Sequence, residues 1–213
     1  KRCKASVFKY EQEWRRMTER LGFWLDMDDP YITYHDTYIE SVWWAVKTIY
    51  EKGLLYRGHK VVPYCPRCGT ALSSHEVAQG YREVTDPSLY VRFPVRGQEK
   101  AFFLAWTTTP WTLPSNAALA VSADAEYAYV RAGDETLIMA KELVEGVVSE
   151  PCSIERVVKG SELVGAEYEP LFAFVEPEEP AWRVVAADFV SLEDGTGIVH
   201  IAPAFGEDDM RVG

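Results

Sequence analysis

Two stretches of the chain, far apart in the sequence, hold side chains that could support hydrolysis. The sequence offers no serine–histidine or cysteine–histidine pair as a nucleophile with its base, so attack by a water molecule fits better than a covalent acyl-enzyme intermediate. A large flat ring at Trp111 follows the first stretch directly, and hydroxyls beside such a ring can line a small pocket that admits a short aliphatic side chain. The candidates are the hydroxyls of Thr107, Thr108 and Thr109, the imidazole of His200 and a carboxylate of the Glu207–Asp209 run.

Each candidate also has a purely structural explanation. Threonine is favoured in strands, and three hydroxyls before Pro110 could end a strand and satisfy a turn. A histidine such as His200, near the end of a strand, is more often a hydrogen-bonded structural residue than a catalyst. The acids Glu207–Asp209 fall in what reads as the first turn of a helix, where carboxylates are favourable against the helix dipole. Residue types alone leave these three acids equivalent.

A pair of cysteines, Cys65 and Cys68, lies in a tight Cys-Pro-Arg-Cys-Gly turn. Such a turn can present two thiolates to zinc, and two free thiols are the alternative. Tetrahedral zinc takes four ligands, but Cys3 and Cys152 have no matching spacing. Only His59 and His75 remain as possible substitutes.

Composition places the chain among globular proteins that bury a core. It has 213 residues, of which 47% are hydrophobic, and no run of eighteen apolar residues or apolar leader segment. Four cysteines are too few for a disulfide framework at this size, so we expect a reducing, cytoplasmic compartment. The chain begins with lysine and ends just after the opening turn of an expected helix, and we therefore expect it to be a fragment.

Charge is distributed unevenly along the chain, whose net charge is −11. Residues 1–100 hold 16 Lys+Arg against 13 Asp+Glu, whereas residues 101–213 hold 6 against 20. Nucleic-acid affinity comes mainly from neutralising phosphates, so the acidic half is not expected to hold RNA by itself.

The elements that must position the candidates change from helices to strands near residues 81–87. Ser6 is expected to cap a first helix, and Thr37 with Glu40 forms the capping box of a second that stops at Gly53. Residues 54–64 read as a strand, and a last helix follows Gly206. Eight further strands are expected at 89–95, 101–107, 117–121, 127–131, 136–140, 154–158, 182–190 and 196–201. We therefore predict an α+β fold with a β-barrel-like part.

Three stretches resemble the isoleucyl-tRNA synthetase family in order and spacing: 62–69 (VPYCPRCG), 106–116 (WTTTPWTLPSN) and 195–209 (GTGIVHIAPAFGEDD). The related valyl and leucyl enzymes typically carry arginine at the third threonine, so Thr109 favours the isoleucyl family. The resemblance covers nearly the whole chain. It implies that residues 1–64 are a mainly helical part of the class I catalytic body, 65–86 a zinc knuckle and linker, and 87–213 an editing domain truncated at its C-terminal end.

Editing in this family removes valine wrongly attached to tRNA(Ile). Such ester hydrolysis needs a grip on the substrate ammonium group, a placed water and donors for the oxyanion. The resemblance implies that the three threonines hold the terminal adenosine and the ester, and that Asp209 anchors the ammonium group. His200 would limit the size of the side chain that enters. Such a second, smaller site is needed because binding alone discriminates poorly between side chains that differ by one methylene, for which isoleucine and valine are the standard example. Further substrate contacts are implied at Trp111, Ala204, Phe205 and Gly206.

The resemblance also implies cofactors and partners. Because the family's second Cys-x-x-Cys lies further downstream, Cys65 and Cys68 are expected to supply half of a structural Zn²⁺ site. Both ATP-binding signatures of class I synthetases, His-x-Gly-His and Lys-Met-Ser-Lys-Ser, are missing, so ATP and Mg²⁺ belong to the parent enzyme only and this chain should not aminoacylate. Its partners would be tRNA(Ile), held mainly elsewhere in the enzyme, and the valyl-adenosine end. We expect a monomer without membrane contact.

Two other functions compete with this interpretation. One is a non-catalytic tRNA-binding or structural module with a decayed pocket, which the intact set of hydroxyls, imidazole and acid argues against. The other is the equivalent domain of a valyl-tRNA synthetase, which Thr109 in place of arginine and Trp111 in place of an acid disfavour.

Overall fold

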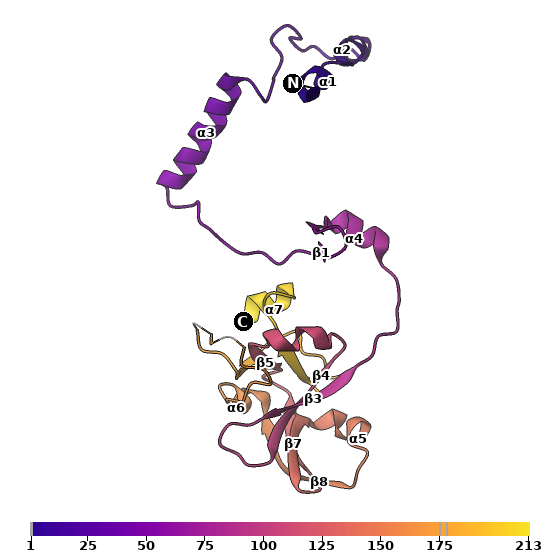
Figure 1. The fold of residues 1–213 in the computed structure, drawn as a ribbon, viewed down its shortest axis with the longest axis vertical. Coiled ribbons are helices and arrows are strands. Elements are labelled where there is room, and N and C mark those ends of the chain that lie inside the picture. The colour runs from indigo at the N-terminus through magenta and orange to yellow at the C-terminus, as the bar shows by residue number, and fades with distance from the viewer. Residues whose placement is uncertain (1, 175, 178) are drawn as a thin grey trace. The chain divides into compact units, whose positions relative to one another are not determined.

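The chain folds into two compact units, Lys1–Gly58 and His59–Gly213, within a computed structural model that describes residues 2–174, 176, 177 and 179–213. Helices make up the first unit and strands dominate the second (Figure 1). The predicted α+β class is therefore confirmed. In the described part of the chain, no helix combines the length and apolar character needed to cross a membrane.

The first unit contains α1 (Arg2–Val7), α2 (Glu11–Arg20) and α3 (Asp36–Glu51). Both predicted caps are wrong. Ser6 lies inside α1, and the residue before α2 is Tyr10, which makes no side-chain capping bond. Thr37 lies inside α3, one residue after Asp36, whose carboxylate is favourable in the first turn.

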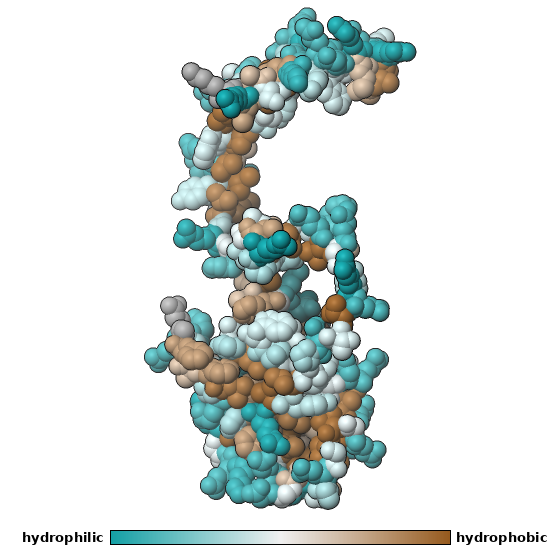
Figure 2. Space-filling model, turned by 45° about the vertical axis from the view of Figure 1, so that its right-hand side comes forward, coloured by the Kyte–Doolittle hydropathy of each residue, from teal (hydrophilic) through white to brown (hydrophobic). Residues whose placement is uncertain are grey.

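The apolar side chains of α2 and α3 stay exposed within this unit, since neither helix contains a buried residue. On α3, Trp43 is 67% and Trp44 70% exposed, and apolar residues reach the surface along this helix (Figure 2). Burial of an aromatic side chain is worth roughly 1.5–3 kcal/mol, and the first unit by itself leaves this gain unused.

The second unit opens with a small hairpin, in which β1 (Tyr64–Cys65) pairs antiparallel with β2 (Thr70–Ala71). The expected strand over 54–64 is wrong for residues 54–63, which are not in a strand; pairing begins only where the Pro63 carbonyl accepts from the Leu72 amide at 2.8 Å, next to β1. Helix α4 (Ser74–Gly80) follows and begins with a capping box between Ser73 and Glu76 that the sequence analysis missed.

Eight strands form the body of the second unit in two sheets. The larger sheet has the order β3-β4-β7-β6-β8, in which only the β4–β7 pair is parallel; the smaller has the order β10-β5-β9, in which β5 and β9 are parallel. The strands are β3 (Leu89–Pro94), β4 (Ala101–Thr107), β5 (Ala118–Val121), β6 (Glu126–Ala132), β7 (Glu135–Ala140), β8 (Cys152–Lys159), β9 (Arg183–Ala186) and β10 (Ile198–Ile201).

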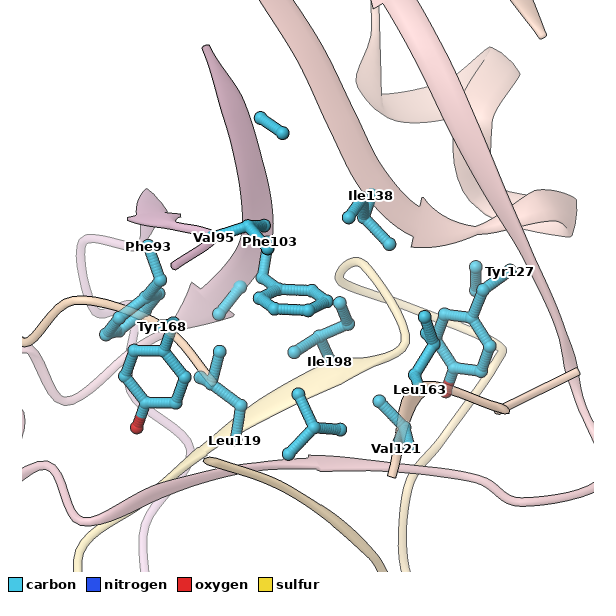
Figure 3. Close-up of a cluster of buried hydrophobic side chains, with 14 of the residues drawn as sticks. Phe93, Val95, Phe103, Leu119, Val121, Tyr127, Ile138, Leu163, Tyr168 and Ile198 are labelled. Carbon is cyan, nitrogen blue, oxygen red and sulfur yellow. The ribbon is translucent and has the colours of Figure 1, made fainter. Parts of the chain in front are cut away.

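The main core lies between these two sheets. Aromatic and branched side chains from both sheets meet there, as Figure 3 shows for Phe103 from the larger sheet and Leu119 and Ile198 from the smaller. Strand β5 is buried at every position, so its sequence reads as a continuous apolar run instead of an alternation. The apolar runs that predicted strands thus also explain why the two sheets pack together.

The sheets connect at a short segment rather than closing into one barrel. Tyr168 bridges to Val95 at the end of β3, and Glu167 bridges to Arg183 at the start of β9. Among the strands that the structure describes, the pairing leaves two open sheets.

Short helices connect the strands. The 3-10 helix η1 (Pro110–Ser115) leads from β4 towards β5, and α7 (Glu207–Val212) follows β10 as predicted. The others are η2 (Lys141–Leu143), α5 (Val144–Val147) and α6 (Gly160–Leu163).

Candidate functional site

A cavity of about 460 Å³ lies where the end of β4 and η1 meet β10 and the start of α7. We call it the threonine cavity. Its volume falls in the usual range for small-molecule sites. The lining residues are Trp106, Thr107, Thr108, Thr109, Trp111, Thr112, Phe189, Ser191, Asp194, Gly195, Thr196, Gly197, Ile198, Val199, His200, Phe205 and Asp209.

The structure brings most of the predicted site residues to this one cavity. All of the following line it, although they come from two stretches far apart in the sequence: the three threonines, Trp111, His200, Phe205 and Asp209. Ala204 and Gly206 do not line it, and the two cysteines of the β1–β2 hairpin lie outside it. The cavity therefore unites hydroxyls, an imidazole, an acid and an indole.

The three threonines differ in their surroundings. Thr107 ends β4 and is only 7% exposed, and its Oγ1 accepts a 3.1 Å hydrogen bond from the Thr109 amide. Thr109 is exposed and immediately precedes η1, where Pro110 suits the first helical position. Thr108 is half-buried, and its hydroxyl has no hydrogen-bond partner in the part of the chain that the structure describes. The hydroxyls of Thr107 and Thr109 lie 3.4 Å apart, so of the three only that of Thr108 lacks a described protein partner.

His200 is a buried residue of β10, paired in register with Leu119 of β5. Both of its ring nitrogens have protein partners: Nε2 is 2.8 Å from Thr112 Oγ1, and Nδ1 is 3.0 Å from Asn116 Nδ2. Burial lowers the pKa of His200, while the charge of Asp209 partly opposes that shift. The ring is therefore neutral near pH 7 and has no free nitrogen with which to act as a base. Its contribution to the cavity is steric, as part of the wall.

Asp209 is the one acid of the Glu207–Asp209 run that lines the cavity. It is half-buried in the first turn of α7, and its Oδ2 accepts a 3.0 Å hydrogen bond from the Ala202 amide. Its neighbours are exposed, and Asp208 instead pairs with Arg211. The tertiary structure thus separates three acids that residue types alone left equivalent.

The charge of the cavity favours a cationic group. Two carboxylates line it, that of Asp209 and that of Asp194 at its exposed rim, whereas none of the described lining residues is a lysine or an arginine. Asp209 forms no ion pair with any other described residue. Opposite charges attract more strongly where solvent is partly excluded, so this carboxylate can receive an ammonium group.

Two residues that the sequence analysis did not single out organise the site. Thr112 lines the cavity and Asn116 supports His200 from outside the lining. Both lie in the quoted 106–116 stretch, four positions apart, and that spacing of polar residues beside the threonine run was the available signal.

Two glycines let the backbone approach the cavity wall closely. A Cβ at Gly195 would lie 3.0 Å from the Trp106 ring, and one at Gly197 would lie 2.4 Å from the Ala140 Cβ. Both have positive φ, at 70° and 69°, which glycine adopts without steric cost.

The cysteine turn provides two sulfur donors. The Cys68 amide donates to Cys65 Sγ at 3.4 Å, and this bond is the main cause of the lowered pKa of Cys65, followed by the Cys68 side chain and the Arg67 amide. Gly69, with φ of 68°, closes the turn. Amide donors to a sulfur suit a thiolate ligand, yet no group of three or more metal-ligating side chains occurs in the described residues.

Comparison with known proteins places these residues in a family context. Residues 1–198 match the family model described as tRNA synthetases class I (I, L, M and V). The chain is 60% identical over 213 residues to the isoleucine–tRNA ligase of Clostridium novyi (strain NT) and 58% identical over 212 residues to that of Clostridium tetani (strain Massachusetts / E88). Each match covers 100% of this chain and 20% of the relative. The chain thus spans about a fifth of the length of the curated relatives it matches.

Among solved structures, the crystal structure of GlLeuRS-CP1 matches with a TM-score of 0.49 and 16% identity, over 59% of this chain and 58% of that one. The Plasmodium knowlesi cytosolic leucyl-tRNA synthetase editing domain matches with a TM-score of 0.48 and 16% identity, over 62% of this chain and 63% of that one.

Proposed function

Because the chain belongs to the class I tRNA synthetases of the isoleucine, leucine, methionine and valine group, we propose that its threonine cavity is the editing site of an isoleucine–tRNA ligase, which hydrolyses valyl-tRNA(Ile). The observation that carries the proposal is the convergence of the Thr107–Thr109 run, His200 and Asp209 on one cavity. The high identity to isoleucine–tRNA ligases, over a fifth of their length, supports the choice of amino acid.

Asp209 is the proposed anchor for the α-ammonium group of the bound valine. Its carboxylate is held by the Ala202 amide, carries no competing ion pair with a described residue and faces a cavity without lysine or arginine among its described lining. A charge-assisted hydrogen bond to an ammonium group is stronger than a neutral one. This contact would distinguish an aminoacyl ester from an ester without a free amine.

The hydrolysis itself is direct attack of water on the ester carbonyl. The water oxygen bonds to the carbonyl carbon, the tetrahedral intermediate forms, and the bond from that carbon to the ribose oxygen breaks. The ribose oxygen takes a proton that the water releases, giving free valine and the tRNA hydroxyl. The half-buried Thr108 hydroxyl, free of described protein partners, is the best-placed of the three to donate to the adenosine end or to the developing oxyanion.

His200 is the proposed size limit of the cavity. Its ring is buried and both nitrogens are bonded to the protein, so the ring cannot turn aside for a larger side chain without breaking the bonds to Thr112 and Asn116. Valine would enter, and isoleucine, longer by one methylene, would meet the ring.

The remaining proposals concern the rest of the parent enzyme. Residues 87–213, with their two open sheets, would form the editing domain, 1–64 part of the catalytic body and 65–86 the zinc knuckle and linker. Cys65 and Cys68 are suited to hold half of a structural Zn²⁺ site, in which the metal would cross-link this turn to a second pair of ligands. ATP with Mg²⁺, and most contacts to tRNA(Ile), would belong to parts outside this chain, in a cytoplasmic monomer.

The test is deacylation of valyl-tRNA(Ile) by the 213-residue chain and by a full-length isoleucine–tRNA ligase that carries this segment. We expect the full-length enzyme to release valine and to spare isoleucyl-tRNA(Ile). If it charges tRNA with isoleucine normally but leaves valyl-tRNA(Ile) intact, the proposed function is wrong.

A further inference from the structure

A continuous series of hydrogen bonds runs from the core to the threonine cavity. It begins at Tyr168, a fully buried residue that does not line the cavity, whose hydroxyl donates to Asn116 Oδ1 at 2.6 Å. Asn116 Nδ2 contacts His200 Nδ1 at 3.0 Å, and His200 Nε2 contacts Thr112 Oγ1 at 2.8 Å. Thr112 Oγ1 then donates to the carbonyl oxygen of Thr109 at 2.8 Å.

The direction of every bond in this series is determined by its ends. The Thr109 carbonyl can only accept, so the Thr112 hydroxyl donates its one O–H to that carbonyl. The same hydroxyl must therefore accept from His200 Nε2. Asn116 Nδ2 also lies 2.9 Å from the Ala118 carbonyl, which can only accept, so this end of the amide is the NH₂ group. His200 Nδ1 therefore accepts a hydrogen bond from the Asn116 NH₂ group, and the neutral ring carries its proton on Nε2.

Tyr168 is itself held on both sides. Its amide donates to the Trp182 carbonyl at 3.0 Å, and the residue bridges to Val95. Arg96 makes ion pairs at 2.7 Å with Glu167 and 3.0 Å with Glu169, the two neighbours of Tyr168. The hydroxyl thus reaches Asn116 from a fixed backbone, and burial raises the pKa of Tyr168 and keeps it a donor.

Trp182 holds Asn116 from a second direction. Its Nε1 donates to the Asn116 carbonyl at 3.2 Å, and its own amide donates to the Ala117 carbonyl at 2.7 Å. Trp182 has φ of 58°, a left-handed conformation that costs energy for a residue with a side chain and persists only where surrounding contacts impose it. Both the side chain and the backbone of Asn116 are therefore positioned, the first by Tyr168 and the second by Trp182.

We propose that Tyr168 is a positioning residue for the editing reaction: through Asn116, it holds the His200 ring in one orientation and as the neutral tautomer protonated on Nε2. This inference rests on the proposed function for its effect on catalysis, but its structural part concerns His200 alone. Without the Tyr168 hydroxyl, Asn116 Oδ1 loses its donor, the amide becomes free to turn, and the ring that limits the cavity loses a defined partner at Nδ1.

The structural test is ¹⁵N NMR of histidine-labelled chain, which distinguishes a protonated ring nitrogen from an accepting one. The wild type should show His200 with its proton on Nε2. Tyr168→Phe keeps the ring that packs edge-on against Phe93 and removes only the hydroxyl, and it should shift the His200 signals towards a mixture of tautomers. Tyr127→Phe is the matched control. It also removes a buried hydroxyl, one that bonds Gly197 and Ser122 outside this series, and it should leave the His200 tautomer unchanged.

Asn116→Asp provides a second, stronger test that does not depend on Tyr168→Phe folding. A carboxylate at this position can only accept, so it should force a proton onto His200 Nδ1. If His200 remains protonated on Nε2 alone in Asn116→Asp, or if Tyr168→Phe and Tyr127→Phe give the same His200 signals, the inference is overturned.

The catalytic part is read in a full-length ligase carrying each variant. Tyr168→Phe should lower the preference for deacylating valyl-tRNA(Ile) over isoleucyl-tRNA(Ile) by about fivefold to tenfold, the effect of one lost hydrogen bond, and Tyr127→Phe should not. If Tyr168→Phe changes the His200 tautomer but the wild-type enzyme does not edit, the proposed function is contradicted and the His200 assignment stands. An unchanged preference in Tyr168→Phe, with normal editing in the wild type, would refute the positioning role.

Discussion

Thr112 and His200, 88 positions apart in the sequence, share a hydrogen bond of 2.8 Å between Oγ1 and Nε2. The bond joins η1 to β10, the two elements that bring the threonine run and the histidine to one cavity. Both side chains are almost fully buried, Thr112 at 5% and His200 at 7% exposure. A buried polar pair of this kind stabilises the site only while both partners are present, and this dependence makes it testable.

Thr112→Val should destabilise the chain by about 1–3 kcal/mol, because it leaves the buried Nε2–H of His200 without its protein partner. The Thr109 carbonyl loses the hydroxyl but keeps the Thr112 amide as a donor at 3.1 Å. Thr112→Ser keeps the hydroxyl and should cost about 1 kcal/mol, the value of one buried methyl group. Urea unfolding of the 213-residue chain measures both. Equal losses in the two variants would show that the methyl, and not the hydrogen bonds, matters at this position.

His200→Ala should let a full-length ligase hydrolyse its own correct product. Removing the ring opens the wall of the threonine cavity, and isoleucyl-tRNA(Ile) should then be deacylated along with valyl-tRNA(Ile). The measurement is the deacylation rate of each charged tRNA, together with the net yield of isoleucyl-tRNA(Ile). Undiminished charging with isoleucine would contradict the size-limiting role.

Asp209→Asn should reduce deacylation of valyl-tRNA(Ile) by about 10- to 100-fold and leave aminoacylation near normal, since a hydrogen bond to a charged group is worth about 1.5–3 kcal/mol. The asparagine keeps a carbonyl oxygen to accept from the Ala202 amide, so the local fold should survive. Asp208→Asn, one residue earlier and outside the cavity, is the matched control and should have no effect. Equal rates in the two variants would remove Asp209 as the anchor.

Gly197→Ala should destabilise the chain more than Gly133→Ala. Both glycines have positive φ, at 69° and 61°, so a left-handed backbone lowers the free energy of unfolding by roughly 1–2 kcal/mol in each alanine variant. Only the Cβ at position 197 meets a neighbour, Ala140 Cβ at 2.4 Å, whereas the space at Gly133 is open. The difference in unfolding free energy between the two variants isolates the clash, and no difference would mean that the cavity wall shifts freely.

His200 should titrate below its ordinary pKa of 6.5, because burial disfavours the charged ring and the Asp209 carboxylate offsets this only in part. The folded pKa lies below the unfolded one, so the stability contribution of His200 is fully present above about pH 6.5 and is lost as the pH falls towards the folded value. Histidine NMR across this range, with the signal assigned by His200→Gln, measures the titration. Asp209→Asn should lower the pKa further, and a rise would contradict the assigned cause.

Much of the strand pattern could be predicted from the sequence, because apolar and β-branched runs between turn residues report local preference. The predicted strand over 101–107 matches β4 at both ends. Helix starts were predicted less well. Ser6 and Thr37 are common capping residues, but capping depends on which residue leaves helical geometry, and that choice is made by the chain on either side. Residues 54–63 failed as a strand because a strand needs a partner, which local sequence cannot supply.

The sequence by itself determined which chemical groups are present and, through three motifs in order, the family to which the chain belongs. The tertiary structure alone decided which of them share a cavity. It selected Asp209 from three adjacent acids by aiming one carboxylate at the Ala202 amide and the cavity, and it added Asn116 and Tyr168 behind His200. Distances between residues 84 and 52 positions apart depend on how two sheets pack and connect, and a local pattern of residue types carries no information about such packing.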